Sequence, residues 1–170
     1  MRGIVLALTM SVALVAGGCG GDDSGSGERT KEDYLAEADA FCKKQNVEAR
    51  ERNQKLQDVA TSAKSEDEFF EKVVPELEDG LDWARDQQKE FADIEPPPAD
   101  KGTIDKINAT NADALGKLEE ATDAARDRDL DKFTKLAEEE SSIDDRANEM
   151  AKDYGFKECG SSNNEAEATS

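Results

Sequence analysis

Four acidic side chains in the second half of the chain have the spacing of a calcium-binding loop. They occupy positions 1, 3, 5 and 12 of the EF-hand pattern, and they are Asp127, Asp129, Asp131 and Glu138. That pattern needs a glycine at position 6 for its sharp turn, but this chain has Lys132 there, and the apolar spacing that follows is helical. We therefore interpret these acidic residues as the start of a helix, which the helix dipole favours, and we predict no metal site.

A second candidate site consists of three polar side chains on otherwise apolar helix faces. Gln45, Asn111 and Glu140 each interrupt a stripe of apolar residues spaced three and four apart. Counted from a hairpin near residue 99, the helical rise places all three within a slab about 6 Å thick. Such a layer can fix the register of a bundle, as buried asparagine does in coiled coils, and we favour this interpretation. The alternative is a small polar pocket that binds a ligand.

The chain lacks a residue type that most catalytic sites need. It contains no histidine, which excludes Ser-His-Asp and Cys-His sites as well as histidine-based zinc and di-iron sites. Acidic pairs are abundant, but carboxylates on exposed helix faces are usually solvated, and a glycosidase-like pair needs a cleft. The sequence therefore predicts no catalytic residue, no cofactor and no enzyme.

The amino-terminal segment has the layout of a secretory signal peptide. Met1 and Arg2 precede an apolar run of 12 residues, 4–15, which is too short to span a bilayer as a helix. The small residues 16–18 before Cys19 resemble the lipobox of bacterial lipoprotein signals, in which the cysteine becomes the lipidated first residue. Ala16 stands where that pattern usually has leucine, so cleavage by ordinary signal peptidase without lipidation is the alternative.

Lipidation of Cys19 implies a protein anchored to the outer side of the bacterial cytoplasmic membrane, since two acyl chains suffice for stable anchoring. Residues 19–30 are rich in Gly, Ser and Asp, and they predict a flexible tether. The formal net charge of -19 argues against a nucleic-acid partner, which requires a basic surface. The expected partners are therefore the membrane, through the anchor, and a protein of the cell envelope.

Two further cysteines, Cys42 and Cys159, lie near the two ends of the remaining chain. In an oxidising compartment they are expected to form a disulfide that closes nearly the whole domain, and the alternative is a pair of free buried thiols. The bridge matters because the core is thin: Leu, Ile, Val and Phe make up 22 of the 151 residues after Cys19. Such a low fraction with high net charge suggests disorder, but helical periodicity and the cysteine pair argue against it.

Helical periodicity divides the chain into four segments, at about residues 31–63, 65–94, 101–128 and 129–154. Their similar lengths and short connections predict an all-α fold, an antiparallel up-down-up-down four-helix bundle. The predicted organisation is a signal peptide at 1–18, the lipidated Cys19 and tether at 19–30, the bundle at 31–160, and a disordered tail at 161–170.

Local signals mark the ends of these segments. Thr30 and Asp129 are suited to N-caps, and Ser65 with Glu68 forms a capping box. Gly155 can end the last helix in the left-handed conformation.

The second segment contains two residues that do not fit a regular inward stripe. Pro75 lacks an amide donor, so we expect a kink or a break there. Trp83 lies beside the stripe that includes Ala84, Gln88 and Phe91, and we expect it on a partly covered flank rather than at a ligand site.

The two ends of the domain carry short motifs. The sequences Tyr34-Leu35-x-x-Ala38-Asp39-Ala40-Phe41-Cys42 and Tyr154-Gly155-Phe156-x-x-Cys159, with the prolines at 96–98 between them, resemble a family of small uncharacterised bacterial lipoproteins. The resemblance covers residues 34–160 and implies a helical, disulfide-closed, surface-anchored domain without a known activity.

Together these features predict a membrane-anchored extracytoplasmic lipoprotein that acts as a non-enzymatic interaction or binding module. The alternative is a protein that binds a small ligand or a divalent cation through the polar layer of Gln45, Asn111 and Glu140.

Overall fold

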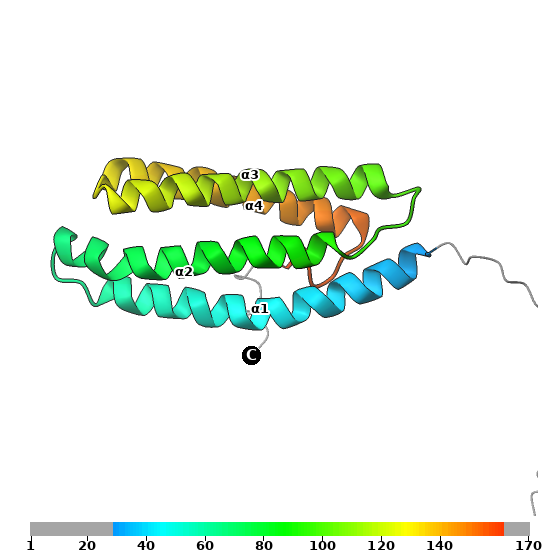
Figure 1. Cartoon of the computed structure of the whole chain (residues 1–170), viewed down its shortest axis with the longest axis horizontal. Helices are drawn as coiled ribbons and strands as arrows, with labels where there is room; N and C mark the ends of the chain where they lie inside the picture. The colour runs from blue at the N-terminus through cyan, green and yellow to red at the C-terminus, as the bar shows by residue number, and fades with distance from the viewer. Residues whose placement is uncertain (1–28, 162–170) are drawn as a thin grey trace, which may run out of the picture.

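The computed structural model describes residues 29–161 and shows four helices without a strand in this range. They are α1 (Lys31–Thr61), α2 (Glu66–Ala92), α3 (Lys101–Arg126) and α4 (Leu130–Tyr154). Each helix runs back alongside the one before it (Figure 1). The predicted all-α four-helix bundle is confirmed. The predictions for the signal peptide, Cys19, most of the tether and most of the tail lie outside the described residues.

The predicted helix ends follow from local capping. Thr30 accepts a hydrogen bond from the Asp33 amide at 3.1 Å, and Ser65 accepts one from the Glu68 amide at 3.2 Å. Each of these bonds satisfies an amide that the first turn leaves without a partner. At its C-terminal end, α4 stops where Gly155 adopts a φ of 119°.

Pro75 lies inside α2, which continues through it without a break. We expected a kink or a break at this residue, and the break does not occur. Proline leaves the carbonyl of Glu71 without its usual donor, but both residues are exposed, so water can hydrogen-bond to that carbonyl.

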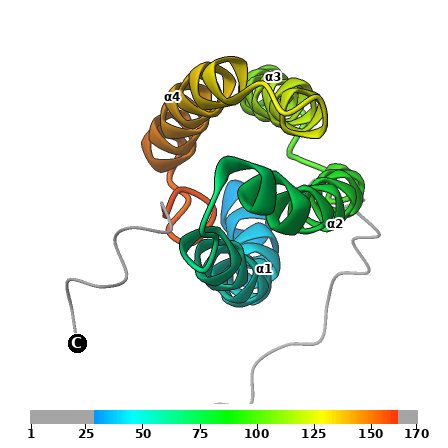
Figure 2. The same ribbon diagram turned by 90° about the vertical axis from the view of Figure 1, so that its left-hand side faces the viewer.

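The helices do not surround the bundle axis evenly. The most extensive contact is between α3 and α4, where small buried residues of α3 such as Ala121, Ala124 and Ala125 allow close approach. The backbone of α2 lies close to α1 and α3, whereas α1 and α4 have no pair of Cα atoms within 8 Å and touch through side chains such as Tyr34 and Tyr154. In the end view, the segment after α4 lies between them (Figure 2).

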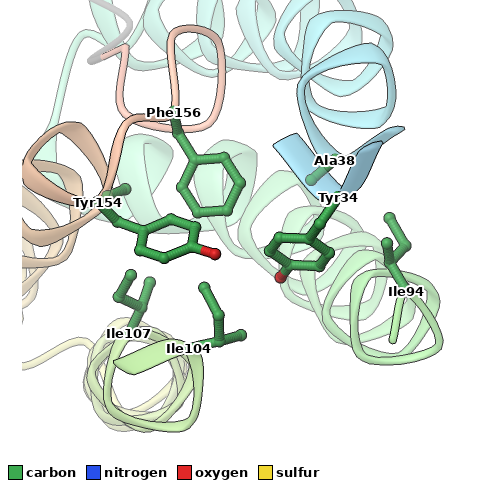
Figure 3. Packing of buried hydrophobic residues seen from close by; sticks show 8 residues of the cluster. Tyr34, Ala38, Ile94, Ile104, Ile107, Tyr154 and Phe156 are labelled. Atoms are coloured by element: carbon green, nitrogen blue, oxygen red, sulfur yellow. The ribbon is translucent and has the colours of Figure 1, made fainter. Parts of the chain in front are cut away.

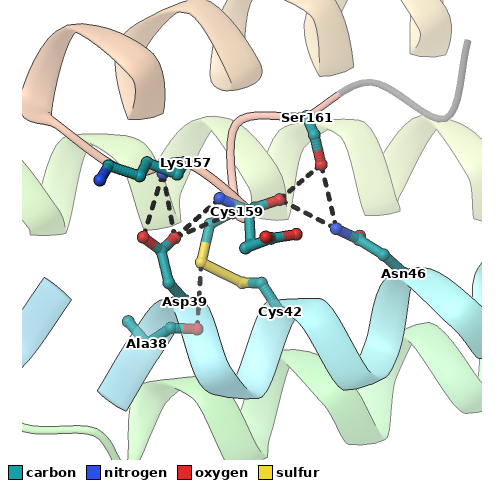
Figure 4. Close-up of a disulfide and its surroundings, with 8 residues drawn as sticks. Ala38, Asp39, Cys42, Asn46, Lys157, Cys159 and Ser161 are labelled. Carbon is teal, nitrogen blue, oxygen red and sulfur yellow. Dashed lines mark hydrogen bonds between the residues drawn. A yellow bond between two sulfur atoms is a disulfide. The ribbon is translucent and has the colours of Figure 1, made fainter. Parts of the chain in front are cut away.

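This segment, residues 156–161, is held against α1, and we call it the C-terminal clasp. The predicted disulfide is confirmed: Cys42 and Cys159 are bonded, with their Cα atoms 5.0 Å apart. The Asp39 carboxylate accepts hydrogen bonds from the amides of Lys157, Glu158 and Cys159 at 2.9–3.3 Å (Figure 4).

The clasp is fixed at a second point by Asn46. Its amide nitrogen donates to the Glu158 carbonyl at 2.9 Å and to the Ser161 hydroxyl at 3.0 Å. Ser161, expected at the start of the disordered tail, is therefore part of the folded domain.

The apolar core consists of two separate regions. The first, the clasp-end core, lies where the clasp meets the α2–α3 connection, and its buried residues are Tyr34, Ala38, Ile94, Ile104, Ile107, Ala151, Tyr154 and Phe156 (Figure 3). The second, the hairpin-end core, lies near the α1–α2 and α3–α4 turns, and its buried residues are Phe70, Val73, Leu77, Ala121, Ala124, Ala125 and Leu136.

Two tyrosines in the clasp-end core differ in how their hydroxyls are satisfied. Tyr34 is fully buried, and its hydroxyl has no hydrogen-bond partner within residues 29–161, whereas the Tyr154 hydroxyl donates to Asp100 at 2.9 Å. Burial raises the pKa of Tyr34 to about 12. Both hydroxyls are therefore neutral at physiological pH, and they differ chiefly in this hydrogen bond.

The matched variants Tyr34→Phe and Tyr154→Phe should therefore change stability in opposite directions. Tyr34→Phe removes an unpaired buried polar group and is expected to raise the free energy of unfolding by about 1 kcal/mol. Tyr154→Phe removes a hydrogen bond to a carboxylate and is expected to lower it by about 1–2 kcal/mol. Urea denaturation of both variants measures the difference, and equal losses would contradict this account of the core.

Candidate functional site

A partly enclosed cavity of about 270 Å³ lies in the middle of the bundle, and all four helices contribute to its wall. An engineered apolar cavity of about 150 Å³ is large enough to bind benzene. The cavity in this protein therefore has room for a molecule of about two rings.

The wall has an apolar and a polar part. The apolar side chains are Phe41, Ala84, Phe91, Ala114, Leu115 and Leu118. The polar side chains are Gln87, Gln88, Asn108, Asn111, Glu140 and Asp144. Trp83 also lines the cavity and contributes both an apolar ring and an N–H donor. This combination of an apolar surface with a few polar groups is typical of small-molecule sites.

The cavity exists because the inward positions at this level of the bundle carry small or polar residues. On α2 they are Ala84 and Gln88, on α3 they are Asn111 and Ala114, and on α4 the residue is Glu140. Alanine fills little volume, and polar side chains gain nothing from dry packing against each other. The two cores therefore close the ends of the bundle and leave its middle unfilled.

Trp83 is held in the wall by contacts from α1. The guanidinium carbon of Arg52 lies 5.3 Å from the centre of the indole ring, within range of a cation–π interaction. Arg52 is itself paired with Glu48 at 3.1 Å and with Asp79 of α2. The contact with Arg52 orients the indole ring. The two carboxylates neutralise the positive charge of Arg52.

Two polar atoms of the wall have no protein partner. The indole Nε1 of Trp83 and the side-chain oxygen Oε1 of Gln87 are both buried, and neither has a hydrogen-bond partner in the described part of the chain. Buried polar atoms are nearly always hydrogen-bonded in folded proteins. Both side chains line the cavity, but other protein atoms cover these two atoms, so a molecule in the cavity reaches them only after the side chains rotate.

Glu140 is the titratable group whose environment changes its pKa most clearly at this site. Burial raises the pKa of Glu140 to about 7, and the negative charges of Asp144 and Asp145 add to the effect. Burial also raises the pKa of Asp144, while its hydrogen bond from Asn148 at 3.0 Å opposes that rise. Near neutral pH, Glu140 therefore exchanges readily between its neutral and charged forms.

The structure brings together part of the predicted polar layer. Asn111 and Glu140 line the same cavity, but Asn111 is exposed to solvent and Glu140 is half-buried, so the expected buried layer does not form. Gln45 is buried, but it does not belong to the lining, and its side-chain oxygen has no partner within residues 29–161. Trp83, expected on a flank outside any ligand site, instead lies in the wall.

Comparison with known proteins identifies no relative. No family model, curated protein or solved structure matches this chain. The resemblance to small bacterial lipoproteins therefore stays a prediction from the sequence motifs, and the function has to be argued from the cavity itself.

The calcium-loop pattern runs from Asp127, the C-cap of α3, through a short turn into α4, so it forms no coordinating loop of its own. Asp129 is the N-cap of α4 and accepts a hydrogen bond from the Lys132 amide at 3.0 Å. Asp131 and Glu138 lie within the wound helix, so their oxygens do not surround a common point. Across residues 29–161, no group of three or more His, Cys, Asp or Glu side chains is placed to hold a metal ion.

No helix within residues 29–161 combines the length and the apolar character needed to cross a bilayer.

Proposed function

We propose that this protein binds a small, partly apolar molecule in the mid-bundle cavity and takes part in no catalysis. The observation that carries the proposal is the cavity itself: a partly enclosed space of about 270 Å³ with aromatic and polar side chains in its wall. In this proposal the chain is exported, and Cys19 anchors it to the membrane so that the cavity lies outside the cytoplasm.

A small-molecule site has more support than a protein-docking surface. Among the described residues, the large apolar side chains that are exposed are Val47 and Leu130, on different helices. Isolated exposed apolar residues are normal on protein surfaces, whereas partner surfaces usually show a continuous apolar patch. The apolar surface that a partner could cover lies inside the bundle, in the wall of the cavity.

Titration with N-phenylnaphthylamine, an uncharged apolar dye, tests this proposal. Trp83 is the single tryptophan of the chain and lines the cavity, so energy transfer from Trp83 to the dye reports binding close to it. We expect saturable binding to the wild-type protein. Ala114→Leu, which puts three more carbon atoms into the cavity, should weaken dye binding at least about tenfold.

Ala112→Leu is the matched control, because it makes the same change at an exposed position of the same helix. It should bind the dye as the wild type does. Melting temperatures of both variants show whether each is folded. Dye binding that is absent, or equal in both variants, would overturn the proposed site.

A further inference from the structure

The wall of the cavity carries negative charge without a cation to balance it. Glu140 and Asp144 are both acidic, and none of the lining residues is basic in the part of the chain that the structure describes. Within residues 29–161 no ion pair or hydrogen bond is made to the Glu140 carboxylate, and the charges that act on it are those of Asp144 and Asp145. An ionised carboxylate in a half-buried position without a partner is unfavourable unless a ligand supplies the positive charge.

Two basic side chains near the cavity wall, Lys117 of α3 and Arg52 of α1, are paired with other carboxylates. Lys117 binds Glu120 at 2.9 Å and Glu139 at 3.4 Å, on the neighbouring position of α4. Arg52 is occupied by Glu48 and Asp79. Neither side chain therefore balances the charge of Glu140, which faces the cavity.

The other groups of the wall suit the same kind of ligand. The amide side chains of Gln88, Asn108 and Asn111 in the wall carry oxygens that can accept hydrogen bonds, as an ammonium group requires. The rings of Phe41 and Phe91, whose centres lie 5.8 Å apart, offer an apolar surface and aromatic faces that attract cations. A carboxylate or phosphate ligand, in contrast, would meet the negative charge of Glu140 and Asp144 without a basic lining residue to balance it, and only neutral amide and indole N–H groups of the wall could donate to it.

Taking the proposed cavity site as given, we propose that its ligand is an organic cation, a protonated amine on an apolar or aromatic body. The ammonium group pairs with Glu140, with Asp144 beside it, and the body packs between the aromatic rings of α1 and α2. The cavity volume limits the body to about two fused rings.

Three indole compounds of similar size separate charge from shape. They are tryptamine, which is a cation, tryptophol, which is neutral, and indole-3-propionate, which is an anion. In calorimetric titrations at pH 8, tryptamine should bind at least about tenfold more tightly than tryptophol, with the propionate weakest. Glu140→Gln should remove the preference for tryptamine over tryptophol, and Glu138→Gln, exposed on the same helix, should keep that preference.

Proton release provides a second readout. No titratable side chain of α1, α2 or α3 lines the cavity, and the acidic groups that act on Glu140 are Asp144 and Asp145 of α4. An ammonium ion should lower the raised pKa of Glu140, so tryptamine binding near pH 7 should release protons. Titrations in two buffers of different ionisation enthalpy count those protons, and the Glu140→Gln variant should release none.

The possible outcomes separate this inference from the proposed function. If tryptamine and tryptophol bind equally, or if the propionate binds best, the cationic ligand is wrong while the cavity site stands. If the dye and all three indoles fail to bind, both the inference and the proposed function are wrong. A preference for tryptamine that persists in Glu140→Gln would show that Glu140 is not the recognising group.

Discussion

Replacing both Cys42 and Cys159 by serine is expected to lower the melting temperature by about 10 °C or more. The disulfide joins residues 117 positions apart, so it constrains nearly the whole folded domain. The chain-entropy model gives about 4.7 kcal/mol for a loop of roughly 100 residues, and observed losses are typically about 2–5 kcal/mol. For a domain of this size, each kcal/mol corresponds to roughly 2–4 °C or slightly more. Thermal unfolding followed by circular dichroism without reductant measures the shift.

The expected loss is large because the disulfide also holds side chains of the clasp in the core. Phe156 is buried and packs at 5.8 Å from the Tyr34 ring and at 6.4 Å from the Phe91 ring, centre to centre. Phe91 lines the cavity, so a released clasp would also loosen the cavity wall. The wild type in excess reductant is the matched control and should melt together with the double variant. An unchanged melt of the double variant would mean that the bridge adds no stability.

The helix ends were predictable because capping depends on neighbours in sequence. Thr30, Ser65 and Asp129 each accept a bond from an amide three residues ahead, so a short stretch of sequence contains both partners. The pairing of Cys42 with Cys159 was predictable for a different reason. Once Cys19 is assigned to the anchor, one pairing within the chain remains.

The way in which the bundle closes was not predictable from helical periodicity. A symmetrical bundle would bring α1 and α4 together, whereas the clasp lies between them in the structure. The burial of Tyr34 beside the inward stripe follows from this arrangement, because its ring packs against Tyr154 and Phe156 at the end of the chain. Such contacts depend on tertiary packing that periodicity does not encode.

The cavity was only partly predictable, for a related reason. Asn111 and Glu140 interrupt their stripes, so their position near the middle of the bundle could be inferred from helical rise. Trp83 enters the wall because of how α2 is rotated about its own axis, and helical periodicity does not determine this rotation. Gln87, one turn further along α2, lines the cavity for the same reason. The sequence feature that predicts a cavity is the occurrence of alanines and polar residues at the same height along the bundle axis, since together they leave volume unfilled.

The pH dependence of stability provides the second large effect, and it depends on Glu140. Its pKa is raised by burial from 4.5 to about 7 in the folded protein. Between these values the folded chain keeps a proton on Glu140 that the unfolded chain releases. A folded state that binds more protons than the unfolded state loses stability as the pH rises. The stability that protonated Glu140 contributes is therefore fully present below about pH 4.5 and is lost as the pH rises to about 7.

Glu140→Gln, which stays neutral, should therefore be more stable than the wild type at pH 8 by about 1–3 kcal/mol, and about as stable near pH 4.5. Urea denaturation across this range measures the difference between the two curves. Glu138→Gln removes the same charge from an exposed position of α4, and it isolates the part of the effect that comes from net charge alone. If the two variants gain stability equally at pH 8, burial of Glu140 is not the cause. If Glu140→Gln gains stability only at high pH and Glu138→Gln does not, the wild type carries a carboxylate that costs folding stability, as expected for a residue kept for binding.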